Sequence, residues 1–136
     1  MDDIATRFRA FPCRYLERQW TPEDGLADVA SSQPMPGSLR SFYRELGGCD
    51  ELLEMYNEFV PAYELTVDAG YLVFVHENQD VVSWGFSPED IESADPVVWQ
   101  RNNEEHAWYS EEKTLAPFLE SMFDWVVGAG DETEKD

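Results

Sequence analysis

The sequence is short of basic residues and has no long hydrophobic run. Lysine and arginine together number nine against 29 acids, which gives a formal net charge of −20. Binding to nucleic-acid phosphates or to anionic lipid surfaces depends on clustered Lys and Arg, so this balance argues against both functions. No apolar run approaches the roughly 18 residues that a membrane-spanning helix needs. We therefore expect neither nucleic acid nor membrane among the partners.

Cysteine is also scarce, and the start of the chain is acidic. Cys13 and Cys49 are the two cysteines, and they form no CxxC pair. Met1 is followed by two aspartates, where a secretory signal would carry basic residues. Without an export signal, cysteines are more often buried thiols than disulfides or metal ligands. We expect a cytoplasmic protein in which both cysteines are buried thiols.

The motifs of common catalytic and cofactor sites are missing as well. The chain contains no glycine-rich phosphate loop, no GxSxG turn and no calcium-binding loop. Neighbouring acids such as Glu111-Glu112 could serve acid–base catalysis, but a chain with 29 acids contains such pairs by chance. The sequence therefore predicts no cofactor and no enzymatic activity.

What is present is enough apolar material for one core. The 136 residues are 43% hydrophobic and 14% aromatic, which is typical of a single globular domain. The charge is uneven: residues 1–44 hold six arginines and six acids, so the whole net charge arises from residue 45 onward. Such a surface accelerates encounter with a basic partner. A generally acidic surface without a dedicated partner explains the charge equally well.

Helical patterns dominate the first half of the chain. Apolar residues at helical spacing predict a first helix interrupted at Pro12, and Thr21-Pro22 predicts the start of a short second helix. Ser38 is the expected N-cap of the clearest helix, and Gly47-Gly48 its expected left-handed stop. Asp50 would begin another short helix. The clearest helix carries a single apolar stripe, formed by Leu39, Phe42, Tyr43 and Leu46.

Strand patterns follow. Residues 63–68 alternate between apolar and polar, and the runs 71–75 and 81–86 flank a polar tip, so these segments predict three successive antiparallel strands. Residues 97–99 suit a fourth strand, and residues 101–109 are expected to form a polar loop that carries aromatic residues.

A closing amphipathic helix is predicted over residues 115–126, with Pro117 in its first turn, where proline is tolerated. Its apolar stripe is formed by Leu115, Phe118, Leu119, Met122, Trp125 and Val126. Residues 128–136 are nearly devoid of apolar side chains and are expected to be an acidic disordered tail. The order of elements predicts an α+β fold. We expect a single domain over residues 1–127, with a central antiparallel sheet of about four or more strands, packed by N-terminal helices and a C-terminal helix.

Several stretches, in order, resemble one known family. The hairpin Gly70–Phe86 resembles the central hairpin of the SUKH superfamily, which joins a yeast regulator of cell-wall synthesis to many bacterial immunity proteins. Four further stretches match its motifs: Pro36–Tyr43, Phe59–Val60–Pro61, Asp95–Trp99 and Phe118–Met122. Val97 stands where the family has a second proline, and the first thirty residues match weakly. The resemblance implies an α+β fold with one antiparallel sheet, and a function in binding rather than catalysis.

The motif residues Trp84 and Gly85 are expected to be architectural, with Trp84 on an inner strand face and Gly85 allowing a helix to approach the sheet. The hairpin tip Glu77–Asp80 and the loop Gln100–Tyr109 are the candidate contacts for a partner, because aromatic side chains surrounded by acids suit a basic protein surface. The expected partner-binding residues are Glu77, Asn78, Gln79, Asp80, Glu104, Glu105, Trp108 and Tyr109. Alternatively, Trp99 and Trp108 close the core, and Asn78 and Gln79 hydrogen-bond the turn.

Three functions are consistent with these observations. The first is a bacterial immunity protein that neutralises a toxin, such as a nuclease with a basic cleft, through its acidic surface. The second is a scaffold or regulatory binding protein, as in the yeast branch of the family. The third is a small metal-dependent hydrolase that uses His76 and His106, although these histidines lack the spacing of a helical zinc motif.

Overall fold

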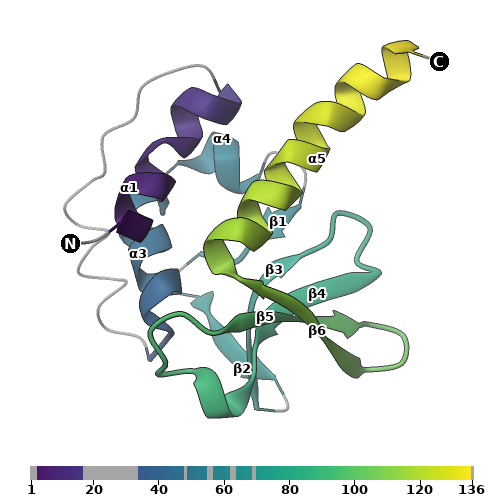
Figure 1. The fold of residues 1–136 in the computed structure, drawn as a ribbon. Helices are drawn as coiled ribbons and strands as arrows, with labels where there is room; N and C mark the ends of the chain where they lie inside the picture. The colour runs from purple at the N-terminus through teal and green to yellow at the C-terminus, as the bar shows by residue number, and fades with distance from the viewer. Residues whose placement is uncertain are drawn as a thin grey trace.

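The computed structural model describes residues 3–16, 34–47, 49–54, 57–61, 64–68 and 70–135 (Figure 1). Its elements combine helices with one sheet, which confirms the α+β prediction. In chain order they are α1 (Asp3–Arg9), the π-helical turn η1 (Pro12–Leu16), α3 (Gly37–Leu46), α4 (Asp50–Leu53), β1 (Glu58–Phe59), β2 (Thr66–Asp68), β3 (Tyr71–His76), β4 (Val82–Phe86), the 3-10 turn η3 (Pro88–Asp90), β5 (Val97–Asn102), β6 (Ala107–Thr114) and α5 (Leu115–Lys135). The helix start expected at Thr21-Pro22 lies outside the described residues.

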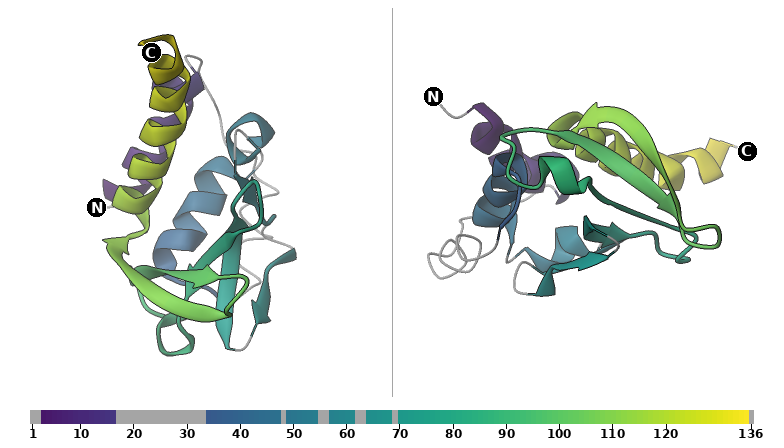
Figure 2. Two further views of the ribbon diagram at one scale, coloured as in Figure 1. Left: turned by 90° about the vertical axis from the view of Figure 1, so that its right-hand side faces the viewer. Right: turned by 90° about the horizontal axis from the view of Figure 1, so that it is seen from below.

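The sheet has six antiparallel strands in the order β1-β3-β4-β5-β6, and β2 also pairs with β3. The predicted hairpin is present as β3 and β4. Of the strand predicted over residues 63–68, Tyr63 lies outside the described residues, and pairing with β3 begins only at Thr66, so the observed strand is shorter. In Figure 2 the sheet is strongly twisted, and α1, α3 and α5 are gathered on one side of it.

The prediction of a polar loop over residues 101–109 is wrong. Strand β5 continues to Asn102, and β6 begins at Ala107, so the segment forms a second hairpin. The Asn102 side chain closes the turn, since its Oδ1 accepts hydrogen bonds from the backbone N–H groups of Glu104 and Glu105. Pairing with β5 therefore overrides the polar composition that suggested a loop.

The core lies between the sheet and the helices, as predicted from the two apolar stripes. The predicted stripe residues of α3 are all fully buried. Phe59 of β1 stacks on Phe123 of α5 with ring centroids 5.9 Å apart, and Phe118 packs edge-on against Phe74 of β3. The rings of Trp84 and Phe118 have centroids 5.6 Å apart. This contact with α5 places Trp84 on the inner face of the sheet, as expected.

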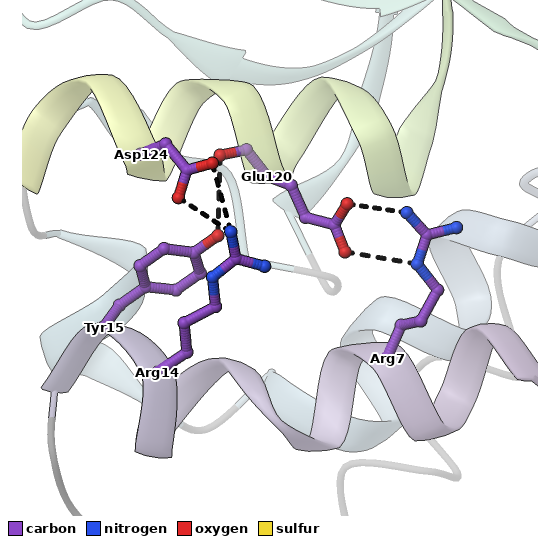
Figure 3. A network of polar contacts seen from close by, with 5 residues as sticks. All are labelled: Arg7, Arg14, Tyr15, Glu120 and Asp124. Atoms are coloured by element: carbon purple, nitrogen blue, oxygen red, sulfur yellow. Dashed lines mark hydrogen bonds and ion pairs between the residues drawn. The ribbon is translucent and has the colours of Figure 1, made fainter.

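The N-terminal segment is an integral part of this core, although it matches the family weakly. Phe8 and Phe11 are fully buried. Ion pairs fasten the same segment to α5: Arg7 pairs with Glu120 at 2.6 Å and Arg14 pairs with Asp124 at 3.0 Å (Figure 3). The hydrogen bond to Glu120 raises the pKa of Arg7. Burial, assisted by Asp124, raises the pKa of Tyr15, which lies in the same contact.

Gly85 has a different role from the one expected. A Cβ atom at this position would lie 2.4 Å from the carbonyl oxygen of Leu72, on the neighbouring strand β3. The register shifts here, because Val73 pairs with Gly85 while Val75 pairs with Trp84, leaving Phe74 as the extra residue of a β-bulge. Gly85 therefore allows two strands to approach each other at the bulge, rather than a helix to approach the sheet.

The ends of α3 also differ from prediction. The helix begins at Gly37, with Pro36 as the capping residue and no side-chain cap. Backbone N–H groups of Gly37 and Ser38 donate to the carbonyls of Ser93 and Ala94, so the segment before β5 satisfies the donors that a serine cap would have served. Gly47 is right-handed, with φ of −62°, so this residue of the predicted Gly47-Gly48 stop is not left-handed, and Gly48 lies outside the described residues.

The C-terminal end of α5 extends further than predicted. Its backbone stays helical to Lys135, past the point at Gly128 where loss of regular structure was expected, and it projects beyond the rest of the fold (Figure 1). The segment holds no proline, and its Ala, Glu and Lys residues favour helix. Within the described residues, no helix is both long and apolar enough to cross a membrane. Cys49 is a free, buried thiol, as predicted.

Candidate functional site

The two hairpin tips lie side by side at one end of the sheet. Backbone N–H of Asn103 donates to the carbonyl of Val81 at 2.9 Å, and the Asn103 side-chain amide donates to the carbonyl of Asp80 at 2.9 Å. These bonds join residues 77–81, between β3 and β4, to residues 103–106, between β5 and β6. We call the two segments together the hairpin end.

The hairpin end unites six of the eight residues predicted to contact a partner. They come from two segments more than twenty residues apart in the chain: Glu77, Asn78, Gln79, Asp80, Glu104 and Glu105. All except the half-buried Glu77 are exposed. Four of the six are acids, so a concentrated negative charge lies at this end of the sheet.

Side-chain oxygens that accept from backbone N–H groups, together with one left-handed residue, hold the first tip in shape. Oε1 of Glu77 accepts from the backbone N–H groups of Gln79 and Val81, at 3.2 and 3.0 Å. Asn57 accepts from the N–H of Asn78 at 3.1 Å. The side chains that form the turn are therefore Glu77 and Asn57, while those of Asn78 and Gln79 are exposed. Asp80 adopts a φ of 61°, as Asp tolerates in turns.

Trp108 does not join this surface. Its ring stacks on Tyr71 with centroids 4.0 Å apart and planes 5° from parallel, and the Arg101 guanidinium lies 5.5 Å from the Trp108 centroid. Arg101 also pairs with Asp68. Successive side chains along a strand point to opposite faces of the sheet. Trp84 faces α5, and Gln100 is its partner on β5. Arg101, the residue after Gln100, and its partner Trp108 on β6 therefore point to the face away from α5.

Trp99 lies 6.2 Å from the same Tyr71 ring, measured between ring centroids. The two tryptophans are half-buried against Tyr71 on the face away from α5 and do not belong to the core, so they do not close it as the alternative expected. Tyr109, the next residue on β6, is 53% exposed. Of the two aromatic residues predicted to contact a partner, Tyr109 therefore remains accessible and Trp108 is half-buried.

A groove of about 460 Å³ lies beside the hairpin end, between the inner face of the sheet and α5. Strands β4 and β6 form one wall and α5 forms the other. Its lining is mainly apolar and aromatic: Asn57, Glu77, Val81, Val82, Trp84, Glu111, Lys113, Phe118, Ser121, Met122 and Trp125. Val81 and Trp125 are large apolar residues that are 55% and 58% exposed. Exposed apolar side chains of this size mark a surface suited to a partner.

Sequence reasoning missed this groove. The apolar spacing of residues 115–126 assigned Trp125 to the buried stripe of the closing helix, but Trp125 is 58% exposed. Glu111 was noted only as one of many adjacent acids. A signal was present in the number of large apolar residues in this part of the helix, but periodicity alone does not show which of them stay exposed.

Glu111 is held in the groove by two neutral donors. Its Oε2 accepts from the Trp84 indole N–H at 2.9 Å and from the Gln100 amide at 2.8 Å. Glu111 lies on β6, while Trp84 and Gln100 lie on β4 and β5, so the carboxylate reaches across the sheet. Its neighbour Glu112 is exposed, with a φ of 61°.

The two histidines lie in different settings. Nδ1 of His76 and Oγ of Ser83 are 2.8 Å apart, and Ser83 is fully buried, which keeps its hydroxyl away from solvent. His106 is an exposed turn residue. Within the part of the chain that the structure describes, no group of three or more His, Cys, Asp or Glu side chains is arranged to hold a metal ion.

Comparisons with protein-family models, with curated proteins and with solved structures gave no significant match to this chain. The resemblance to the SUKH superfamily therefore rests on the sequence motifs alone. The α+β class that it implies agrees with the structure, but a fold class does not specify a function. Function has to be argued from the hairpin end and the groove.

Proposed function

We propose that this chain is a non-enzymatic protein-binding domain that covers a basic protein partner, in the role of an immunity protein that neutralises a toxin in the cytoplasm. One observation carries the proposal: acids from two separate hairpins meet at one end of the sheet, directly beside a groove with exposed apolar walls. The family resemblance supports the immunity role, and the charge supports a basic partner.

The two features would contribute differently to binding. Clustered exposed acids attract a basic surface over several ångströms and raise the association rate, by about tenfold to a thousandfold in strongly steered pairs. Apolar and aromatic side chains lose water on contact and slow dissociation. If the partner is a nuclease, the acids of the hairpin end would occupy the place of nucleic-acid phosphates in its basic cleft.

The test begins with toxin genes that adjoin the gene for this chain. A candidate toxin domain is expressed in a bacterial host with and without the chain, and growth is measured. Restored growth, together with a stoichiometric complex of the two purified proteins, is the expected result. Continued toxicity and no complex with any adjoining toxin domain would contradict the immunity role.

A pair of matched triple variants then tests the hairpin end. The first changes Asp80→Asn, Glu104→Gln and Glu105→Gln, and the control changes three exposed acids elsewhere, Glu64→Gln, Glu89→Gln and Glu92→Gln. Both remove three charges, but only the first removes them at the proposed surface. We expect the first to slow association by about tenfold at low salt and to reduce its salt dependence. Equal rates for the two variants would place the interface elsewhere.

A further inference from the structure

The groove beside the hairpin end combines aromatic walls with two carboxylates that form no ion pair with any cation of the described residues. Trp84, Phe118 and Trp125 supply the aromatic surface, while Glu77 and Glu111 supply the acids. We propose that the groove receives an arginine side chain of the partner protein, with its guanidinium against an indole and a carboxylate. This inference rests on the proposed function and deepens it.

The two carboxylates are oriented in the same way. In each, one oxygen accepts two N–H bonds from neutral groups of the protein: Oε1 of Glu77 from the tip backbone, and Oε2 of Glu111 from Trp84 and Gln100. The second oxygen takes part in none of these bonds. The side chains are therefore fixed in position before any partner arrives, which lowers the entropy cost of binding.

Neither carboxylate is neutralised in the described part of the chain. The ion pairs there join Arg7 to Glu120, Arg9 to Glu45, Arg14 to Asp124 and Arg101 to Asp68. No cation of the described residues lies within 4.0 Å of the carboxylate oxygens of Glu77 or Glu111. Lys113 also lines the groove, so it is the one basic side chain there among the described residues, and it would compete with an incoming cation.

An arginine side chain fits the residues that line the groove better than an apolar side chain or a lysine. A purely apolar side chain would cover the aromatic walls but would also take the two charges out of water without a partner, which is costly. A lysine would supply a charge but not a flat group. The planar guanidinium stacks on an indole and donates to a carboxylate at the same time. The groove volume of about 460 Å³ accommodates such a side chain with its neighbours.

The probe is a pair of capped peptides of equal charge, triarginine and trilysine. The indole N–H resonances of Trp84 and Trp125 in the whole chain are followed by NMR as each peptide is added. We expect saturable shifts of both indoles with triarginine, and an affinity about threefold to tenfold higher than for trilysine. Equal affinity for the two peptides would show general charge attraction and overturn the assignment.

Matched variants locate the effect. Glu111→Gln keeps an oxygen for the Trp84 and Gln100 donors but removes the charge, and Glu112→Gln is its control on the adjacent exposed acid. Trp125→Ala removes an exposed aromatic of the groove, and Val67→Ala removes an exposed apolar side chain of β2, outside the groove. Each groove variant should weaken triarginine binding about threefold to tenfold, and each control should leave it unchanged. Equal losses in variant and control would overturn the assignment.

A capped trileucine peptide tests the apolar alternative. Larger indole shifts with trileucine than with triarginine would assign the groove to an apolar anchor and refute the arginine. The proposed function is judged separately, by toxin neutralisation. A chain that neutralises its toxin while triarginine leaves both indoles unchanged would retain the proposed function and lose this inference. A chain that binds triarginine in the groove but neutralises no adjoining toxin would lose the immunity role instead.

Discussion

The Trp84 indole on β4 donates a 2.9 Å hydrogen bond to the Glu111 carboxylate on β6, across the intervening strand β5. Gln100 on β5 donates to the same oxygen at 2.8 Å. One carboxylate thus ties three strands together and forms part of the groove wall. The contact joins the fold to the proposed site, because the residue that orders the strands also supplies the charge.

The first prediction concerns this contact. Glu111→Ala leaves the Trp84 N–H and the Gln100 amide without their acceptor, so the free energy of unfolding should fall by about 1–3 kcal/mol. Glu111→Gln retains an acceptor oxygen and should lose less than half as much. Urea denaturation measures both. Glu104→Ala, in an exposed turn, is the control. If Glu104→Ala lost as much unfolding free energy as Glu111→Ala, the three-strand contact would not stabilise the fold.

The second prediction concerns the bulge of β3. Gly85→Ala places a Cβ atom 2.4 Å from the Leu72 carbonyl oxygen and 3.1 Å from the Val73 Cα, both on a paired strand. Backbone atoms on both sides have to move, so we expect a loss of about 3 kcal/mol or more in unfolding free energy, or failure to fold. Gln79→Ala at the exposed tip is the comparison. A Gly85→Ala protein as stable as this comparison variant would refute the close strand approach.

The third prediction concerns the second turn, where His106 has a φ of 61°. Glycine adopts this conformation without steric cost, whereas a β-branched residue does not. His106→Gly should therefore unfold at the same urea concentration as the parent chain or at a higher one, while His106→Val should lose about 1–2 kcal/mol. The same pair tests the metal alternative: both variants remove an imidazole, so a metal-dependent activity would be lost in both.

The fourth prediction concerns pH. Burial raises the pKa of Tyr43 above its ordinary value of 10.0, and its hydroxyl donates to the carbonyl of Val60 inside the core. Because the pKa of Tyr43 is raised in the folded state, the contribution of this phenol to stability is fully present below the unfolded-state pKa of about 10. That contribution is lost as the pH rises above about 10. The unfolding free energy should therefore decrease between about pH 9 and pH 11.

Tyr43→Phe isolates this group. The variant should cost about 1 kcal/mol near pH 8, because it loses the hydrogen bond to Val60. It should also lose less stability than the parent chain on going to about pH 11, so the difference between the two should shrink. Urea titrations at both pH values measure it. Tyr109→Phe, which removes a phenol outside the core, is the control. If the difference in unfolding free energy between the parent chain and Tyr43→Phe stays the same at both pH values, the role of burial is contradicted.

Much of the fold could be predicted from local patterns. The stripe Leu39–Leu46 and the runs of β3 and β4 each carry a period that one face of an element imposes, so their type was evident. The prediction of a loop over residues 101–109 was wrong because this segment lacks such a period. Its polar residues have no period of their own, and they form strands because β4 and β5 offer a paired edge. The predicted N-cap of α3 was wrong because residues 93–94, remote in sequence, accept the hydrogen bonds of the first helical N–H groups in place of the Ser38 side chain.

For the candidate site, composition located the acids but not their arrangement. The charge distribution and the family resemblance indicated a binding protein with acidic tips, and whether it binds a toxin stays a prediction. The Asn103 bonds that join the two tips, and the groove with Glu111 and Trp125, depend on strand order and on where α5 crosses the sheet.

The amino-acid sequence by itself determined the α+β class, the apolar faces of the main elements and the concentration of negative charge after residue 44. These follow from the side chains of single segments and from their spacing. Only the tertiary structure decided that two hairpins share one end, that Trp108 packs on Tyr71 and that the exposed Trp125 lines one groove with the carboxylates of Glu77 and Glu111. The reason is physical: a period shows which residues share a face, but burial depends on the neighbouring element that covers it.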